Sequence, residues 1–228
     1  QNEPENYQRL ATVLLPHDYI NYWLTGEKKT EYGDASGTAY FDVKNRTWAP
    51  SILQAIDDSG KLIGCLPELI DSQDPIGTIT LEISRQFQLS PDVIVSSGGG
   101  DNMMGAIGTG NVFPGVVTTS LGTSGTIYSC ADKPIIDPKG ELAAFCSSSG
   151  HWLPLVCTMN VTVSTELTRT LLGLDIENMN QKAASAPVGS EGLTLLPYFN
   201  GERTPSLPNA KAVLYGITGV NYNSENLC

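Results

Sequence analysis

The stretch Val93-Ile94-Val95-Ser96-Ser97-Gly98-Gly99-Gly100-Asp101-Asn102 decides the fold. Its first three residues form a β-branched run after the turn residues Pro91-Asp92, which predicts a short, buried central strand. Three glycines follow, and they permit unusual backbone angles and the close approach of a substrate. Open α/β sheets bind ligands outside the carboxyl ends of their strands. The stretch therefore predicts an α/β fold with a ligand site at the end of this strand.

Asp101 is the candidate catalytic residue of that site. A carboxylate at the end of a strand can accept a proton from a substrate hydroxyl. Asp is also a frequent helix cap, and a helix is expected to start over residues 103–108. The spacing alone favours neither role.

A second candidate site is the turn Gly122-Thr123-Ser124-Gly125, between strands expected over residues 116–121 and 126–130. Successive N–H groups and hydroxyls in a tight turn can bind phosphate oxygens without a basic side chain. The same residue types are ordinary in a plain hairpin turn, and that interpretation is somewhat favoured by the residues alone. The chain has neither a Walker-type nor a Rossmann-type glycine motif.

The third candidate is the segment of residues 196–205, which contains the adjacent charged residues Glu202 and Arg203. Because they follow a strand and lie in a turn, we expect them to tie down a loop by charge-assisted hydrogen bonds. The tryptophans Trp23, Trp48 and Trp152 are expected in the core.

The remaining pattern alternates helices and strands, which predicts a mixed α/β chain with two sheets. Helices are expected over residues 4–15, 18–24, 51–56, 79–89 and 161–172, and strands over 38–43, 152–158 and 192–199. Pro16 is a start signal for the second of these helices, and Thr25-Gly26 is its stop signal. Residues 66–80 read as loop because they are rich in Pro, Asp and Gly. The best domain boundary lies near Ser90-Pro91.

The amino-acid composition argues against nucleic acids, membranes and zinc as binding partners. The 228 residues carry 13 Lys and Arg against 24 Asp and Glu, a net charge of −11 that argues against nucleic-acid binding. No apolar run reaches the ~20 residues that span a bilayer, so no membrane partner is expected. Five cysteines without a C-x-x-C pair, and only two histidines, favour reduced thiols in the cytoplasm and no zinc site. The oligomeric state stays open, a homodimer among the alternatives.

Six segments in register resemble the FGGY carbohydrate kinases over nearly all of the chain. They are Leu15-Pro16-His17-Asp18-Tyr19 with Leu24-Thr25-Gly26, Asp34-Ala35-Ser36-Gly37-Thr38, Asp42-Val43 with Arg46-Thr47-Trp48, Gly98 to Asn102, Ser120 to Gly125, and Gly201-Glu202-Arg203-Thr204-Pro205. Each motif alone is weak, but six in the family's order make a specific signal.

The resemblance implies an actin-like, ribonuclease-H-like ATPase fold of two domains, which is incomplete here. Residues 1–90 are expected to be the C-terminal part of the first kinase domain, and residues 91–228 the N-terminal part of the second. The resemblance also implies that Asp101 is the general base and that Asn102 contacts the sugar. Tyr32 is expected to line the sugar pocket.

The resemblance further implies ATP and Mg²⁺ as cofactors, with Gly122, Thr123 and Ser124 cradling the phosphates of ATP and no metal ligand assigned. The implied reaction is phosphorylation of D-xylulose to D-xylulose 5-phosphate. Glycerol, gluconate or ribulose as substrate stay open, as does a non-catalytic, sugar-kinase-like binding module.

Two features of the family do not occur in this sequence: a first phosphate loop with an acidic residue, and a sugar-binding Met-His pair. The chain also begins without Met and stops inside what resembles a second family signature, which starts at Leu214. We therefore expect a piece of a longer kinase that has no activity by itself.

Overall fold

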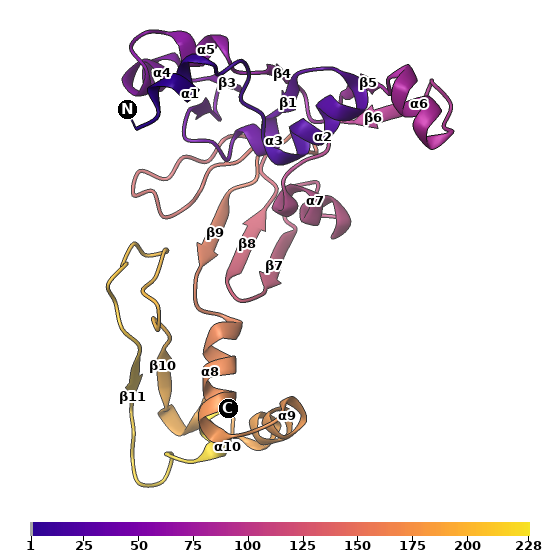
Figure 1. Ribbon diagram of the computed structural model, residues 1–228. Coiled ribbons are helices and arrows are strands. Elements are labelled where there is room, and N and C mark those ends of the chain that lie inside the picture. The colour runs from indigo at the N-terminus through magenta and orange to yellow at the C-terminus, as the bar shows by residue number, and fades with distance from the viewer. Residues whose placement is uncertain (1) are drawn as a thin grey trace. The chain divides into compact units, whose positions relative to one another are not determined.

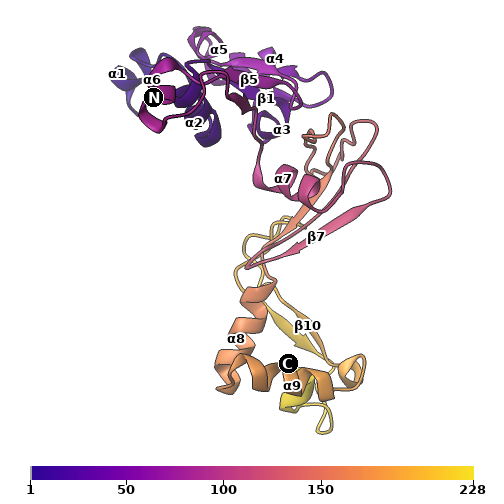
Figure 2. The same cartoon turned by 90° about the vertical axis from the view of Figure 1, so that its right-hand side faces the viewer.

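The computed structural model describes residues 2–228, which divide into two compact units. Unit 1 comprises the chain up to Thr118 together with Tyr128–Asp137 and Ala143–Pro154. Unit 2 comprises Thr119–Ile127, Pro138–Leu142 and Leu155–Cys228. Figure 1 shows the elements of both units, and Figure 2 shows them after a quarter turn.

Unit 1 contains short helices and three small sheets of two strands each. Its elements are α1 (Pro4–Gln8), α2 (Pro16–Thr25), β1 (Lys29–Glu31), α3 (Tyr32–Ala35), β2 (Phe41–Asp42), β3 (Thr47–Trp48), α4 (Pro50–Ile56), α5 (Lys61–Gly64), β4 (Glu68–Ile70), β5 (Pro75–Thr78), α6 (Leu81–Phe87), β6 (Ile94–Ser96) and α7 (Asp101–Gly108). Strands β1 and β4 pair in parallel, whereas β2 with β3 and β5 with β6 are antiparallel.

The following strands β7 (Val117–Leu121) and β8 (Gly125–Ser129) contain residues of both units, and with β9 (Leu155–Thr158) they form a sheet in the order β7-β8-β9. Unit 2 continues with α8 (Thr162–Leu172), α9 (Ile176–Ser185), the short 3₁₀ helix η1 (Ser190–Gly192), β10 (Thr194–Leu196), β11 (Val213–Tyr215) and α10 (Ser224–Leu227). Strands β10 and β11 pair antiparallel.

The predicted helix start and stop signals around α2 are confirmed. Pro16 occupies the first turn, where its missing N–H removes no helical hydrogen bond. The Asp18 carboxylate reaches back to accept the Leu15 N–H at 3.0 Å. The helix ends at Gly26, whose φ of 81° is the left-handed conformation that glycine adopts without strain. These local signals place His17 and Asp18 on the first turn of α2.

The core of unit 1 lies beneath α3. Ala35, Phe41, Val43 and Cys146 form its buried cluster, and Tyr32, Trp48, Leu69, Ala144 and Trp152 pack against it. The Arg46 guanidinium stacks 4.4 Å from the Trp152 ring centroid and donates to the Gly150 carbonyl at 2.6 Å. This contact ties the residue 150 loop to the turn between β2 and β3.

Several sequence predictions were wrong in extent. The helix expected over 4–15 ends at Gln8, because the chain then turns to bond Val13 N–H to the Cys65 carbonyl at 2.9 Å. The expected loop over 66–80 contains β4 and β5, whose short backbone pairings no periodicity reveals. The strands expected over 38–43, 152–158 and 192–199 are shorter in the structure, and α9 and β11 were not foreseen. Residues 2–228 form five small sheets where two were expected.

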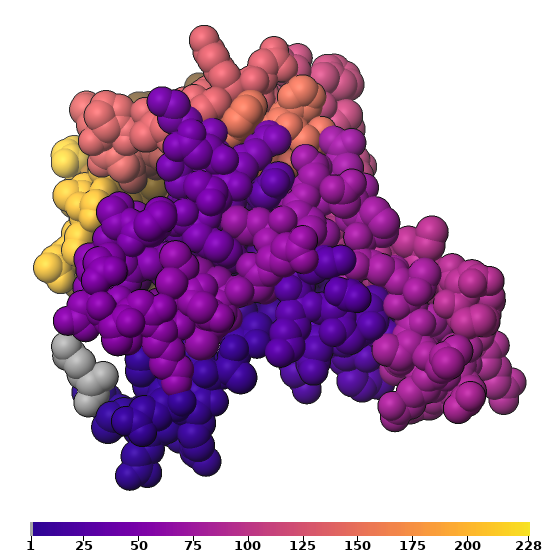
Figure 3. Space-filling view, turned by 90° about the horizontal axis from the view of Figure 1, so that it is seen from above, coloured from indigo at the N-terminus to yellow at the C-terminus, as the bar shows by residue number. Residues whose placement is uncertain are grey.

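The strand at residues 93–95 was predicted to be central and buried, and this was wrong. β6 belongs to a two-stranded sheet with β5, and Ile94 is 67% exposed. The adjoining α6 segment projects from the side of unit 1, as the magenta atoms at the right of Figure 3 show. Trp23 was expected in the core but is 47% exposed, with its ring edge-on to Phe87 at 6.0 Å.

All five cysteines are free thiols, and Cys65, Cys130 and Cys146 are buried. Burial raises the pKa of the Cys146 thiol to about 11, so it stays protonated. Within residues 2–228, no helix has the length and apolar character needed to cross a bilayer.

Candidate active site

The candidate base Asp101 is the first residue of α7, directly after the glycine loop Gly98–Gly100. Gly100 occupies the cap position of that helix, so the structure does not use Asp101 as the helix cap. The carboxylate is exposed, and its Oδ1 accepts the Asn102 N–H at 2.8 Å and the Asn102 Nδ2 at 3.1 Å. Strand, glycine loop and helix thus present a carboxylate to solvent on a short, defined turn.

Helix α7 is held in place by its packing against Tyr128. Met103 and Ala106 of the helix are buried, and Tyr128 is 4% exposed. A Cβ on Gly105 would lie 2.7 Å from the Tyr128 hydroxyl oxygen, so only glycine fits there. Burial, and then the charge of Asp101, raise the pKa of Tyr128. The carboxylate is therefore close enough to influence a buried side chain in the same unit.

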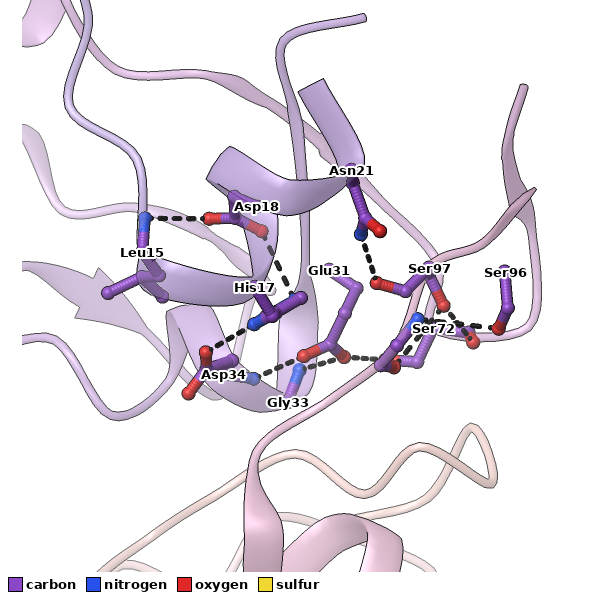
Figure 4. Close-up of polar contacts among 11 residues, drawn as sticks. Leu15, His17, Asp18, Asn21, Glu31, Gly33, Asp34, Ser72, Ser96 and Ser97 are labelled. Carbon is purple, nitrogen blue, oxygen red and sulfur yellow. Dashed lines mark hydrogen bonds and ion pairs between the residues drawn. The ribbon is translucent and has the colours of Figure 1, made fainter. Parts of the chain in front are cut away.

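An ion pair between His17 and Asp34 lies beside the glycine loop, as Figure 4 shows. His17 Nδ1 is 2.7 Å from Asp34 Oδ2, and His17 Nε2 is 3.2 Å from Asp18 Oδ1. The hydrogen bond to Asp34 raises the pKa of His17, and the charges of Asp18 and Asp34 add to that effect against the opposing effect of burial. The imidazolium form of His17 is therefore favoured.

Glu31 is fully buried below this pair and caps α3. Its carboxylate accepts the Gly33 N–H at 2.6 Å, the Asp34 N–H, and the Ser72 hydroxyl. Burial nevertheless raises the pKa of Glu31, and burial likewise raises the pKa of Asp18. Both carboxyl groups are buried, and carboxyl groups whose pKa values are raised by burial are common at functional sites.

The network continues from Ser72 to the start of the glycine loop. Ser97 Oγ donates to the Ser72 carbonyl at 2.8 Å, and Asn21 Nδ2 donates to the Ser97 carbonyl at 2.8 Å. Segments that are far apart in sequence, α2, α3 and the loops after β4 and β6, are therefore linked by one set of polar contacts (Figure 4).

In unit 2, the turn Gly122-Thr123-Ser124 joins β7 and β8, so the predicted hairpin is confirmed. The Gly122 carbonyl accepts the Thr162 N–H at 3.0 Å, and the Thr123 carbonyl accepts the Val161 N–H at 3.2 Å. The turn is thereby fixed to the start of α8, while its three residues stay exposed. An exposed turn with a fixed backbone is suited to binding an anion, although phosphate binding itself stays a prediction.

Glu202 ties down a loop in unit 2, as the sequence predicted. It is 3% exposed and accepts the Met159 N–H at 2.7 Å and the Thr158 hydroxyl at 2.8 Å. Burial raises its pKa, but the hydrogen bonds, including those from Arg203 N–H and Asn160 Nδ2, outweigh burial and lower the pKa to about 2.

The residues predicted for the sugar and phosphate sites divide between the units. Asp101, Asn102 and Tyr32 lie in unit 1, and the turn at residues 122–124 lies in unit 2. The half-buried Tyr32 ring lies 6.2 Å from the Phe41 ring and 5.6 Å from the Arg46 guanidinium carbon. The roles of these residues stay predictions.

Sequence reasoning gave no role to His17, Glu31 or Asp34, although the first and last lie in motifs that were quoted. One signal was available for the two buried acids: Asp18 lies two residues after the helix-starting Pro16, and Glu31 directly precedes α3, which are positions where an acid can cap a helix.

Residues 2–228 contain no group of three or more His, Cys, Asp or Glu side chains arranged to hold a metal ion.

Residues 1–108 match the model of the FGGY family of carbohydrate kinases, N-terminal domain. This match covers 108 of the 228 residues, and the fold of the chain is the actin-like fold of the sugar kinases whose solved structures align with it.

Over its whole length the chain is similar to xylulose kinases. It is 50% identical to the xylulose kinase of Haemophilus influenzae over 228 residues, which cover 100% of this chain and 46% of that protein. The crystal structure of xylulose kinase from Bifidobacterium adolescentis aligns with a TM-score of 0.85 at 31% identity, over 99% of this chain and 49% of the other. The structure of gluconate kinase from Lactobacillus acidophilus aligns with a TM-score of 0.89 at 25% identity, over 100% and 46%. The chain spans about half the length of the curated relatives it matches.

Proposed function

We propose that the protein to which this chain belongs transfers the γ-phosphoryl group of ATP to D-xylulose, forming D-xylulose 5-phosphate. The proposal is supported by an exposed carboxylate, Asp101, at the end of a glycine loop in a chain half identical to a xylulose kinase. A non-catalytic binding module has no need of this carboxylate, so its presence disfavours that alternative.

In the proposed reaction, Asp101 accepts the proton of the terminal sugar hydroxyl. The hydroxyl oxygen then forms a bond to the γ-phosphorus while the bond from phosphorus to the ADP oxygen breaks. Phosphoryl transfer depends mostly on positioning and charge stabilisation, so one aligned carboxylate is sufficient for the base. Asn102, the neighbour of Asp101, and Tyr32 are proposed to contact the sugar.

The turn Gly122-Thr123-Ser124 is proposed to bind the phosphates of ATP. It is exposed, and its backbone is fixed through carbonyl contacts to residues 161 and 162. Backbone N–H groups in such a turn attract anions without a basic side chain. Mg²⁺ is proposed to accompany ATP; because no metal-binding cluster lies among residues 2–228, we derive no step from it.

We propose a cytoplasmic enzyme, since five free cysteines are typical of a reducing compartment. We propose a homodimer as the oligomeric state. The division of the chain into parts of two kinase domains at residues 90 and 91 also stays a proposal.

Gluconate is the second candidate substrate, because the gluconate kinase structure aligns over the whole chain with a TM-score of 0.89. Its identity of 25% is half the 50% shared with the Haemophilus influenzae xylulose kinase, which favours D-xylulose.

The test is a substrate panel on the purified, complete kinase, with sugar-dependent ADP formation as the readout. D-xylulose, D-ribulose, glycerol and gluconate are compared at matched concentrations, and a reaction without sugar gives the background. We expect the highest kcat/KM for D-xylulose. A higher kcat/KM for gluconate than for D-xylulose would make gluconate the substrate. The kinase proposal would be overturned if none of the four compounds gave sugar-dependent ADP formation.

A further inference from the structure

The glycine loop before Asp101 rests directly on the His17–Asp34 ion pair. A Cβ on Gly98 would lie 3.2 Å from His17 Cδ2, and a Cβ on Gly100 would lie 3.2 Å from Asp34 Oδ1. Both distances are tighter than ordinary van der Waals contact, so the loop backbone and the ion pair are in close contact. The glycines leave no layer of side chains between them.

The ion pair itself is held firmly from below. His17 also contacts Asp18, which is 1% exposed and accepts the Leu15 N–H. Asp34 is anchored through its own N–H, which donates to the buried Glu31. Since both partners are fixed to the starts of helices, the surface under the loop is rigid.

A second contact fixes the beginning of the loop. The Ser97 carbonyl accepts Asn21 Nδ2 from the same helix that carries His17, and Ser97 Oγ donates to the Ser72 carbonyl. The loop is therefore held at Ser97 by hydrogen bonds and at Gly98 and Gly100 by contact with the ion pair. The next residue along the chain is Asp101.

We propose that His17 and Asp34 are positioning residues, which set the place of the Asp101 carboxylate through the glycine loop. This inference rests on the proposed kinase function. Neither side chain is proposed to touch substrate. Misplacing a catalytic group by about 1 Å can cost on the order of 100-fold in rate, so loosening this support should lower kcat more than it affects binding.

The test uses the complete kinase with the single variants His17→Ala, Asp34→Ala and the conservative Asp34→Asn. The matched control is His151→Ala, which removes the other histidine of the chain, a partly exposed side chain whose Nδ1 lies 3.7 Å from Asp132 Oδ1. For each protein, kcat, KM for ATP, KM for D-xylulose and the midpoint of thermal unfolding are measured.

We expect His17→Ala and Asp34→Ala to lower kcat by about 10- to 100-fold, with KM for ATP within about twofold of the parent. Asp34→Asn keeps the side chain that the loop rests on and should recover part of that loss. His151→Ala should leave kcat unchanged.

A size exchange separates positioning from a general structural role. Gly100→Ala introduces a Cβ 3.1 Å from Met103 Sδ and 3.2 Å from Asp34 Oδ1 and should lower kcat. Gly100→Ala combined with Asp34→Ala removes the carboxylate contact and leaves only the contact with the flexible Met103 side chain. If the contact sets the loop, the double variant should lose less kcat than the product of the two single losses. Independent, multiplicative losses, or parent-like kcat in the His17 and Asp34 variants, would overturn the proposal.

These outcomes are distinct from a failure of the kinase proposal. If the parent enzyme phosphorylates D-xylulose and Asp101→Asn abolishes this, while His17→Ala and Asp34→Ala are fully active, only the positioning inference is lost. Should the alanine variants be too unstable to purify, Asp34→Asn and Gly100→Ala decide the question by the same kcat measurement.

Discussion

His17 Nδ1 lies 2.7 Å from Asp34 Oδ2, and this pair joins the first turn of α2 to the short helix α3. Both residues lie within motifs of the FGGY family, yet neither was assigned a role from the sequence. In the structure they lie in a polar network with Asp18 and Glu31, two buried acids whose pKa values are raised by burial. The network gives the fold a pH dependence with a definite sign.

Stability should fall as the pH rises above neutrality. The folded-state pKa of His17 is raised above its ordinary value of 6.5, mainly by Asp34. The folded state therefore holds its proton more tightly than the unfolded chain, so this stabilisation is complete below pH 6.5 and is lost as pH rises through the folded-state pKa. The raised pKa values of Asp18 and Glu31 also make the fold less stable as the pH rises, and their effect begins at the lower pH at which carboxyl groups titrate.

The measurement is the midpoint of chemical unfolding between about pH 6 and pH 9. His17→Gln should flatten the decline over this window, and His151→Gln, at an exposed position, should keep it. A decline that is equally steep in the parent and in His17→Gln would show that His17 does not cause it.

Two glycines of α7 should respond oppositely to the same substitution. Gly105→Ala places a Cβ 2.7 Å from the hydroxyl of the buried Tyr128 and should cost about 1–3 kcal/mol of unfolding free energy. Gly108→Ala meets nothing within 4 Å and should be neutral or stabilise by up to about 1 kcal/mol. Denaturant unfolding of both variants checks this, and similar losses in both would contradict the packing of α7 on Tyr128.

Glu202 should be the acid whose removal costs most in unit 2. Glu202→Ala leaves several buried donors without their acceptor and should lower the unfolding free energy by about 3 kcal/mol. Glu166→Gln is the matched control, because it breaks an ion pair to Arg169 at the surface, where solvent screens the charges and little stability is lost. Equal losses of unfolding free energy in the two variants, measured by urea unfolding, would show that Glu202 does not hold the loop in place.

The contribution of Glu202 also has a pH window. Its pKa is lowered to about 2 in the folded state from an ordinary 4.5, so its stabilisation is present above pH 4.5 and is lost as pH falls through about 2. The stability difference between the parent and Glu202→Gln should accordingly shrink as the pH falls below 4.5.

Local signals predicted the elements next to the candidate site well. The helix expected to start at residue 103 is present as α7, which starts earlier, at Asp101. Pro16 and Gly26 gave the bounds of α2, because caps and turns depend on residues close in sequence. The β7–β8 hairpin was predicted for the same reason.

Long-range pairings were not foreseeable in the same way. Strands β4 and β5 are short, and they pair with residues about 20 to 40 positions away, so no periodic pattern marks them. The exposure of Ile94 depends on which strands stand beside β6, which composition does not reveal. The His17–Asp34 contact likewise arises only when α2 and α3 pack together.

The role of Asp101 as the general base can be tested by the turnover of D-xylulose in the complete kinase carrying Asp101→Asn, with ATP binding measured on the same protein. We expect a loss of turnover on the order of 10²- to 10⁴-fold with ATP affinity largely kept. Turnover equal to that of the parent enzyme would show that Asp101 is not the general base.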